Sequence, residues 1–237
     1  MARAYRSEYN LLKSFIIKDG NDYPVECVKS LRFWARFNPI TYEDLSKNNL
    51  TGSYSGDITS TKNSVDSGEV LPIGIFPGDP AHVQVSGSPL LSFSTAESGA
   101  VPTTASDQPF SISTWVKVDH LDSHHYILTK KSVNPESTSS TGYEYYFAIL
   151  STGGVLFNLS DTTESSACFP KVNTADGAII AGQWHHILVT YDGRGASDAD
   201  DGMSIYIDGV FSVNTRTGTQ SNYKGMCPNS QYPLLAG

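Results

Sequence analysis

The sequence predicts an all-β fold, and three observations lead to this prediction. Residues 110–118 alternate apolar and polar side chains with a period of two, as a half-buried strand requires. Residues 184–193 and 203–209 form two strand-like runs joined by a polar segment rich in Gly and Asp, which is typical of a β-hairpin. No segment of twelve or more residues shows a helical period. We therefore expect an antiparallel β-sandwich.

Composition and charge set outer limits on the class of protein. A length of 237 residues with 39% hydrophobic and 11% aromatic residues allows one large β-domain or two small ones. The net charge of -8, without any basic stripe, argues against a nucleic-acid partner. The first ten residues lack the apolar region and cleavage site of a signal peptide, and no run reaches the length of a membrane span. We expect a protein that is made in a cytoplasm and does not insert into a membrane.

Residues 1–29 differ from the rest of the chain. Basic side chains, such as Arg6 and Lys13, are interleaved there with apolar ones, such as Leu12 and Phe15. The segment fits an extra strand on the main domain, or an arm that docks on a partner. From residue 30 to 237 we expect a single domain.

Turn-forming residues mark the ends of the expected strands. Residues 30–37 alternate and end at Asn38-Pro39, and two short runs flank the segment 77–80, which is rich in Pro and Gly. Polar segments at 44–70 and 86–109 are expected surface loops. The expected strands are 30–37, 73–76, 82–85, 110–118, 126–131, 143–150, 155–160, 184–191, 203–208 and 210–213.

Two of the expected connections are tight hairpin turns. Residues 151–154 give a four-residue connection, and Asp208-Gly209 gives a two-residue primed turn. Residues 184–191 are apolar on both faces, so we expect a central strand that is covered from both sides.

The succession of these strands resembles a known family. Residues 110–117 are similar to the strand that opens the diagnostic part of laminin-G-like, concanavalin A-like jelly rolls. Residues 127–131, 143–150, 184–193 and 205–209 are similar to the family's later strands, and 33–37 with 44–49 to its first strand and following turn. The resemblance covers about residues 30–237 and implies a concanavalin A-like antiparallel β-sandwich jelly roll.

The C-terminal end departs from the family's pattern. The family usually closes with a strand resembling Phe-x-Gly-x-Ile-Asp-Glu-Val-x-Ile-Tyr, whereas this sequence ends at residues 233–237, Pro-Leu-Leu-Ala-Gly. A sandwich without that strand would expose unpaired backbone. We expect the domain to lack its closing C-terminal strand, because the chain is part of a longer polypeptide or because a neighbouring chain supplies the strand; we prefer the first explanation.

The resemblance also implies glucanase relatives, which use catalytic carboxylates. Glycoside hydrolysis needs two carboxylates that flank the scissile bond. Glu136, Glu144 and Glu164 are isolated, and no Glu-x-Asp-x-x-Glu run is present. No nucleophile elbow, phosphate loop or His-Glu-x-x-His motif is present either. We predict that the protein is not an enzyme.

Two clusters are candidates for metal binding. Asp198, Asp200 and Asp201 crowd a loop beside a glycine, and Ca²⁺ favours carboxylate oxygens on such loops; the alternative is a solvated acidic tip. The second cluster has the ligand types of a transition-metal site or is a polar turn. Its members are Asp119, His120, Asp122, His124 and His125.

Histidines, aromatic residues and cysteines give weaker candidates. The resemblance places His185 and His186 on a structural strand, so neither is expected to act as a ligand or a base. Cys27, Cys168 and Cys227 have no zinc spacing; free thiols are expected, with a Cys168–Cys227 disulfide as the alternative. Carbohydrate binding would use aromatic side chains, unless these form the core. The candidates are Trp115, Tyr143, Tyr145, Tyr146 and Tyr206.

Together these observations favour a non-catalytic structural or adhesion protein on a virion surface, with a lectin-like domain. Capsid decoration, a fibre or a tail appendage of a phage would each combine cytoplasmic synthesis with action outside the cell. Its expected partners are other virion proteins, further copies of itself, or a surface glycan. The alternative is a carbohydrate-binding module of a larger secreted or cell-surface protein, and a divergent glycosidase is the third hypothesis.

Overall fold

The computed structural model divides the chain into two compact units, residues 1–81 and 82–237. It describes residues 31–32, 35–37, 42–44, 46, 48–64, 70–78, 81–96, 107–131, 143–161, 168–217, 222–228 and 230–237. The arm expected at residues 1–29, and Cys27 within it, lie outside these described residues. The boundary expected at residue 30 stays a prediction, and the expected domain 30–237 includes parts of both units.

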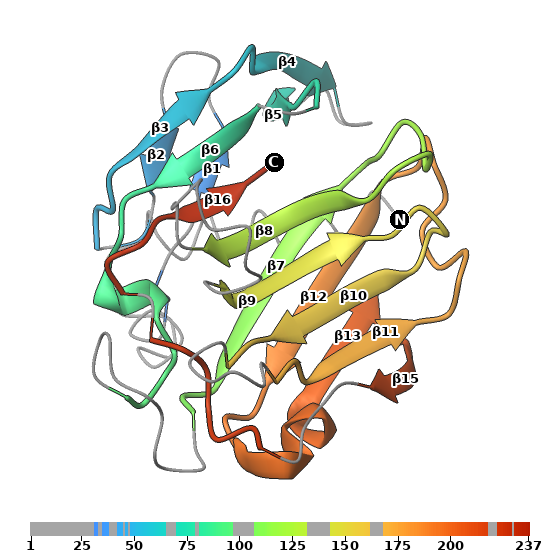
Figure 1. The fold of residues 1–237 in the computed structure, drawn as a ribbon. Helices are drawn as coiled ribbons and strands as arrows, with labels where there is room; N and C mark the ends of the chain where they lie inside the picture. Colours follow the sequence, from blue (N-terminus) through green and yellow to red (C-terminus); the bar gives the residue numbers. More distant parts are fainter. Residues whose placement is uncertain are drawn as a thin grey trace, which may run out of the picture. The chain divides into compact units, whose positions relative to one another are not determined.

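The described residues of the first unit form five short strands (Figure 1). Two antiparallel pairs join β1 to β2 and β4 to β5. Their bounds are β1 Ala35–Phe37, β2 Tyr42–Asp44, β3 Gly52–Ser55, β4 Thr59–Ser64 and β5 Val70–Ile75. Strands β2, β3 and β4 fall in or beside the polar region where we expected mostly loop, because short polar strands lack the alternation that reveals buried ones.

The carboxylate of Asp44 organises the turn after β2. It accepts hydrogen bonds from the backbone N–H groups of Ser46 and Leu50, both at 2.8 Å. Asn49 follows with a φ of 49°, a left-handed conformation that Asn tolerates better than most residues. An Asp side chain that accepts backbone hydrogen bonds is a common way to fix a turn, so the turn expected at residues 44–49 is confirmed.

The second unit is a sandwich of two antiparallel sheets, which confirms the predicted all-β fold. The larger sheet runs β15-β11-β10-β9-β8-β16-β6, and the smaller sheet runs β14-β13-β12-β7. In Figure 1, β7, β12 and β13 pass behind β8 to β11. The bounds are β6 His82–Val85, β7 Phe110–Val116, β8 His125–Lys131, β9 Tyr143–Ile149, β10 Val155–Leu159, β11 Lys171–Thr174, β12 His185–Tyr191, β13 Met203–Ile207, β14 Val210–Phe211, β15 Val213–Thr217 and β16 Leu234–Ala236.

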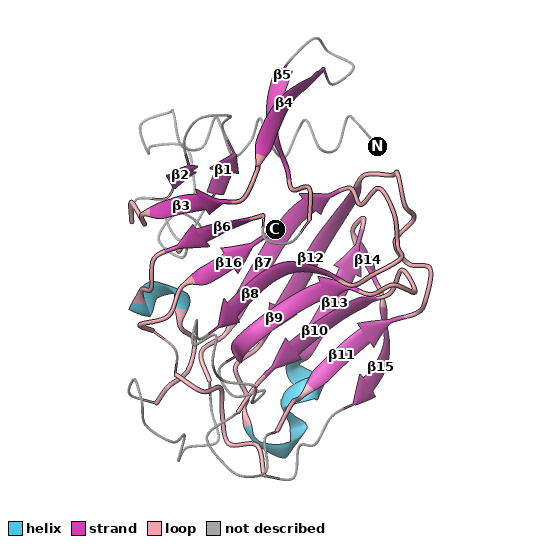
Figure 2. Cartoon of the chain, turned by 45° about the horizontal axis from the view of Figure 1, so that its top comes forward, coloured by secondary structure: helices cyan, strands magenta, loops and turns pink. Residues whose placement is uncertain are grey.

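Helices are a minor part of the second unit (Figure 2). They are the 3₁₀ helices η1, Pro89–Leu91, and η2, Ala196–Gly202. No helix in the described part of the chain is long and apolar enough to cross a membrane.

Aromatic rings join the two sheets in the core. Phe110 on β7 stacks on Phe93 with ring centroids 4.4 Å apart. The same ring meets Tyr145 on β9 at 4.9 Å and Phe157 on β10 at 5.9 Å. Burying such large side chains supplies much of the free energy that holds the sheets together.

The exposure of β12 differs from the expectation. Its odd-numbered residues, such as Ile187 and Val189, are buried, whereas His186 and Leu188 are half-buried. The strand is central because β7 and β13 pair with it on its two sides. Its apolar outer face is therefore not covered as fully as its composition predicted.

Both predicted hairpin turns are confirmed. The backbone of Leu150 bonds to Gly154 across the first turn, at 2.7 Å. Asp208 and Gly209 have φ angles of 52° and 83°, as a primed two-residue turn between β13 and β14 requires.

Three strands of the second unit were not predicted. Strand β11 has a single buried aliphatic residue, and most of β15 continues past the expected end at residue 213. The last strand, β16, lies between β8 and β6. That the domain lacks the closing strand of its family stays a prediction.

A buried carboxylate, Glu144, holds the segment after η1. One of its oxygens accepts hydrogen bonds from Ser92 Oγ at 3.0 Å and from the backbone N–H groups of Phe93 and Ser94 at 2.6 and 3.1 Å. Lys130 is fully buried, interacts electrostatically with Glu144, and donates a hydrogen bond to the carbonyl of Tyr232. Burial raises the pKa of Glu144 to about 7 and lowers that of Lys130 to about 8.

A second buried carboxylate, Asp107, holds the segment before β16. It accepts hydrogen bonds from Tyr223 Oη at 2.9 Å, Tyr191 Oη at 3.1 Å and the backbone N–H of Met226 at 2.7 Å. Burial raises the pKa of Asp107 to about 6, even though all three donors favour the charged carboxylate. Tyr191 and the segment 223–226, which are distant in sequence, thus both donate hydrogen bonds to the Asp107 carboxylate.

Replacing Glu144 should show how much the fold depends on its acceptor oxygen. Glu144→Ala leaves two backbone N–H groups and Lys130 without this partner, so we expect a loss of about 3 kcal/mol or more in the free energy of unfolding. Glu144→Gln keeps an acceptor oxygen and should lose less. Urea denaturation followed by tryptophan fluorescence measures both, and equal losses would contradict this role for the oxygen.

The hydroxyl of Tyr223 should matter more at high pH. Because the folded pKa of Asp107 is raised to about 6, its contribution to stability is full below its unfolded pKa of about 4 and is lost as the pH rises through about 6. Tyr223→Phe removes a donor to the charged form, so its cost should be about 1.5–3 kcal/mol at pH 8 and smaller at pH 5.

The same denaturation experiment at the two pH values checks this expectation. Tyr206→Phe, a half-buried tyrosine on the outer face of the smaller sheet, is the matched control and should change stability by less than about 0.5 kcal/mol. A Tyr223→Phe cost that is the same at both pH values would exclude coupling to the Asp107 carboxylate.

Candidate ligand-binding surface

Three tyrosines gather on the outer face of the larger sheet, and we call them the tyrosine cluster: Tyr126, Tyr143 and Tyr146. The ring of Tyr146 lies 5.7 Å from that of Tyr126 and 5.3 Å from that of Tyr143. Tyr126 is 48% exposed, and the other two are half-buried. The cluster therefore presents phenol rings and hydroxyl groups to solvent from two neighbouring strands, β8 and β9.

Two irregularities in the pairing of β8 with β9 create the tyrosine cluster. Lys130 pairs with Tyr145 and Lys131 with Tyr143, so Glu144 is an extra residue without a partner across the ladder. Such a bulge breaks the alternation of faces, and Tyr143 and Tyr146 come to the same side. A second shift, between Tyr126 and Leu128, turns Tyr126 to that side as well.

The environment of Tyr146 affects the pKa of its hydroxyl group. Burial, followed by the influence of Tyr126 and Tyr143, raises the pKa of Tyr146 to about 12. Tyr146 is therefore protonated at neutral pH, and its hydroxyl can both donate and accept a hydrogen bond.

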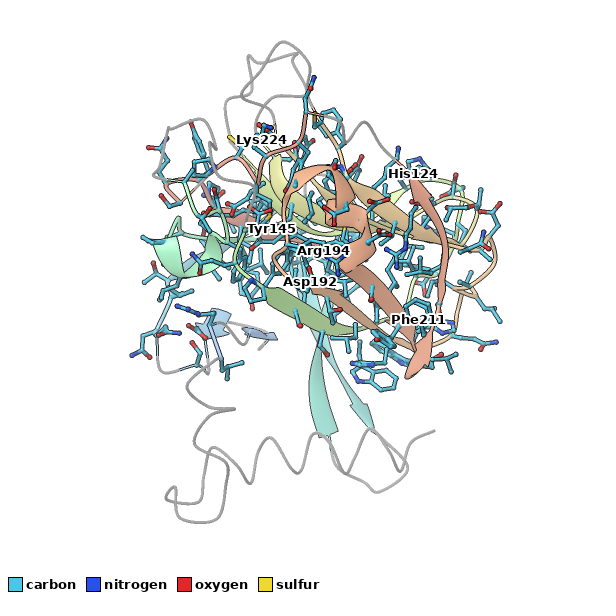
Figure 3. The ribbon with its side chains drawn as sticks, turned by 90° about the horizontal axis from the view of Figure 1, so that it is seen from below. His124, Tyr145, Asp192, Arg194, Phe211 and Lys224 are labelled. Atoms are coloured by element: carbon cyan, nitrogen blue, oxygen red, sulfur yellow. The ribbon has the colours of Figure 1, made fainter. Side chains whose placement is uncertain are left out.

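Tyr145 is a core residue and not part of a binding surface, which corrects its place among the sequence candidates. It is buried against Phe93 and Phe110, and its hydroxyl donates to the carbonyl of Leu91 at 2.9 Å. Figure 3 shows it in the interior of the sandwich. Tyr126, which was not among the sequence candidates, lies with Tyr143 and Tyr146 in the tyrosine cluster.

The other two aromatic candidates lie on the outer face of the smaller sheet. The ring of Trp115 is 5.3 Å from that of His186, and His186 Nε2 lies 2.8 Å from Ser113 Oγ. The ring of Tyr206 meets the edge of Phe211 at 5.6 Å, and Phe211 is 53% exposed. Of the exposed side chains on this face, Phe211 is apolar, whereas Ser111 and Ser113 carry hydroxyl groups.

His185 has a structural environment. The backbone N–H of Ile180 donates to its Nε2 at 3.1 Å, so Nδ1 carries the proton and donates to Asp208 Oδ2 at 2.9 Å. The other oxygen of Asp208 accepts from the backbone N–H of His186. Both ring nitrogens of His185 are engaged, as expected for a residue that fixes a hairpin and not for a catalytic base.

Arginines lie beside the acidic residues of η2. Asp198 is 3.8 Å from Arg194, and Asp201 is 3.9 Å from Arg216. The side chain of Arg216 also donates to the carbonyl of Asp200, and Arg194 forms a close pair with Asp192, visible in Figure 3. Ca²⁺ binding by Asp198, Asp200 and Asp201 stays a prediction, and the arginines reduce the attraction of this loop for a cation.

The histidine-rich segment 119–125 forms local contacts. His120 Nδ1 lies 2.6 Å from Asp122, His125 Nε2 lies 2.9 Å from the carbonyl of His120, and the backbone N–H of Ser151 donates to His124 at 3.0 Å. Among the described residues, no group of three or more His, Cys, Asp or Glu side chains is arranged to hold a metal ion. Cys168, which is buried, and Cys227 do not form a disulfide bond with each other.

Carboxylates are scarce beside the tyrosine cluster. Glu144 is the one acidic residue in the described strands β8 to β11, and it is buried in hydrogen bonds to the segment 92–94. The pair of carboxylates that glycoside hydrolysis requires is therefore not formed by these four strands.

Solved structures with a similar fold include the binding domains of a mosquitocidal protein and of a botulinum neurotoxin. The binding domain of Paraclostridial Mosquitocidal Protein 1 is 15% identical with a TM-score of 0.52, and the match covers 88% of this chain and 48% of that chain. The binding domain of botulinum neurotoxin DC in complex with SialylT is 16% identical with a TM-score of 0.50, covering 88% and 44%. This chain thus spans less than half the length of these structures, and no curated protein sequence matches it.

The sequence itself matches a family model. The match covers residues 93–232 and ends two residues before β16. The family is described as the concanavalin A-like lectin/glucanases superfamily. The predicted laminin-G-like, concanavalin A-like class is confirmed by this match together with the two-sheet architecture. The chain belongs to the concanavalin A-like lectin/glucanases superfamily.

Proposed function

We propose that this protein is a non-catalytic glycan-binding domain, and that the tyrosine cluster is where it contacts the glycan. The observation that carries this proposal is the exposed ring of Tyr126 within 5.7 Å of Tyr146, on a sheet face that two bulges shape.

Tyrosine rings suit the chemistry of a sugar. A pyranose has an apolar C–H face that packs on an aromatic ring, and hydroxyl groups around its rim that need hydrogen-bond partners. A phenol supplies both the apolar ring and a polar hydroxyl at low cost in side-chain entropy. Binding surfaces commonly combine aromatic area with a few polar groups in this way.

A similar structure supports a role in recognising cell surfaces. It belongs to botulinum neurotoxin type C, whose cell entry is dependent upon interaction with two ganglioside molecules; it is 16% identical to this chain with a TM-score of 0.51. Gangliosides are glycolipids, so cell entry of that toxin depends on a glycan; this chain matches 43% of its structure.

The absence of a carboxylate pair on β8 to β11 supports binding without catalysis. Glu144 is committed to three hydrogen bonds in the core and faces away from the tyrosine cluster. The family includes glucanases as well as lectins, and this arrangement favours the lectin side.

The setting that we propose for this domain is the exterior of a phage particle, as capsid decoration, a fibre or a tail appendage. A particle that adheres to a host needs a domain that recognises surface glycans, and this sandwich would provide it. The alternative setting is a larger secreted or cell-surface protein that carries the same domain as a carbohydrate-binding module.

Removing one ring from the tyrosine cluster should weaken glycan binding. Tyr126 is well exposed, so Tyr126→Ala should fold normally and lose about tenfold or more in affinity, the usual size of an aromatic contact at the centre of an interface. A glycan array identifies ligands for the unaltered protein, and titration calorimetry then measures the affinity of each variant.

Tyr206→Ala is the matched control, because it removes a half-buried tyrosine from the outer face of the other sheet. Its affinity for the glycan should stay within about twofold of the unaltered protein. If Tyr206→Ala loses binding and Tyr126→Ala does not, the glycan binds the smaller sheet and the proposed site is wrong.

The proposed virion setting is tested separately. We expect peptides of this protein in purified phage particles, at a stoichiometry set by the symmetry of the structure that carries it. Quantitative mass spectrometry of the particles, with antibody labelling in electron micrographs, measures this. Detection of the protein only in host-cell extracts or culture medium, and not in particles, would refute it.

A further inference from the structure

A lysine shares the sheet face of the tyrosine cluster. Tyr146 pairs with Asn158, and Asn158 pairs with Lys171, so these residues stand in one row across β9, β10 and β11. Directly paired residues of antiparallel strands point to the same face. The burial of β11 agrees, because Val172 and Thr174 are buried and Lys171 is half-buried.

The side chains between Tyr146 and Lys171 are short and buried. Asn158 is 1% exposed and bonds to the carbonyl of Leu159, and Ala148 in the next row is also 1% exposed. Two strand spacings separate Tyr146 from Lys171, which is about 10 Å. A disaccharide is long enough to contact both ends of this row.

The charge on this face is opposite in sign to that of the whole protein. Strands β9, β10 and β11 contain two charged residues, Glu144 and Lys171, and Glu144 is turned into the core. The protein as a whole has a net charge of -8. Lys171 is therefore the charged residue of these three strands that is not turned into the core. Its positive charge favours an acidic group of a ligand over a neutral one.

We propose that the glycan bound at the tyrosine cluster is anionic, and that its carboxylate or sulfate group is recognised by Lys171. This inference rests on the proposed function. An ammonium group and an acid of a sugar form a charge-assisted hydrogen bond, while the sugar ring packs on Tyr126 and Tyr146. The protonated hydroxyl of Tyr146 adds a further donor for an anion.

The experiment compares three probes by titration calorimetry: lactose, 3′-sialyllactose and lactose 3′-sulfate. We expect at least one of the two acidic probes to bind about threefold to tenfold more tightly than lactose at low salt. This difference in affinity should become smaller at high salt, because salt screens the charge. The better acidic probe identifies whether the acid is a carboxylate or a sulfate.

Variants at Lys171 locate the source of this preference. Lys171→Met keeps the length of the side chain and removes its charge, so the acidic probe should fall to the affinity of lactose, whose own binding should not change. Lys171→Arg should restore the preference. Lys224→Met, which removes an exposed lysine outside the larger sheet, is the matched control and should leave all three affinities unchanged.

The outcomes separate this inference from the proposed function. Loss of all binding in Tyr126→Ala, together with equal affinity for acidic and neutral probes, would uphold the tyrosine cluster and overturn the role of Lys171. A preference for acid that survives Lys171→Met would also overturn that role. Unchanged binding in Tyr126→Ala with loss in Lys171→Met would instead refute the tyrosine cluster, and no binding of either acidic probe at millimolar concentration would overturn the inference.

Discussion

Glu144 sits where the pairing of β8 with β9 skips a residue, and its carboxylate turns into the core to accept three hydrogen bonds from residues 92–94. A buried carboxylate without partners would cost several kcal/mol, so its donors and Lys130 must be in place for the fold to form. Because this extra residue faces inward, Tyr143 and Tyr146 on either side of it face outward together. The polar network of the core and the candidate binding surface are therefore two sides of one bulge.

Asp107 performs a related task at the other buried network. Its hydrogen bonds to Tyr191, Tyr223 and the backbone of Met226 join β12 to the segment that leads to β16. In both networks a carboxylate satisfies backbone N–H groups of irregular segments that could not find partners in a sheet ladder. Long connections of this sandwich are thus fixed by specific acceptors and not by apolar packing alone.

The sequence predicted the regular parts of the second unit because burial of one face imposes a period of two. Residues 110–116 and 203–207 show that period, and the turn at Asp208-Gly209 has the chemistry that its positive φ angles require. Strand β11 escaped prediction because Val172 is its one aliphatic residue. The bulge at Glu144 also escaped, since strict alternation places Tyr143 with Tyr145, whereas the structure places Tyr143 with Tyr146. The composition of this strand left its tyrosines as candidates for either a binding surface or the core, and only the register shows which of them face outward.

A surface of this kind has consequences for how tightly a single domain can hold a glycan. The three rings of the tyrosine cluster and Lys171 offer a glycan few fixed hydrogen-bond partners, so we expect the affinity of one site to be modest. Linking several copies makes each later binding event intramolecular and raises the overall affinity by orders of magnitude without any new contact. Fibres, capsids and multidomain adhesins all present their binding domains in multiple copies. A modest affinity at the tyrosine cluster would therefore suit the proposed surface setting, where many copies of the domain act together.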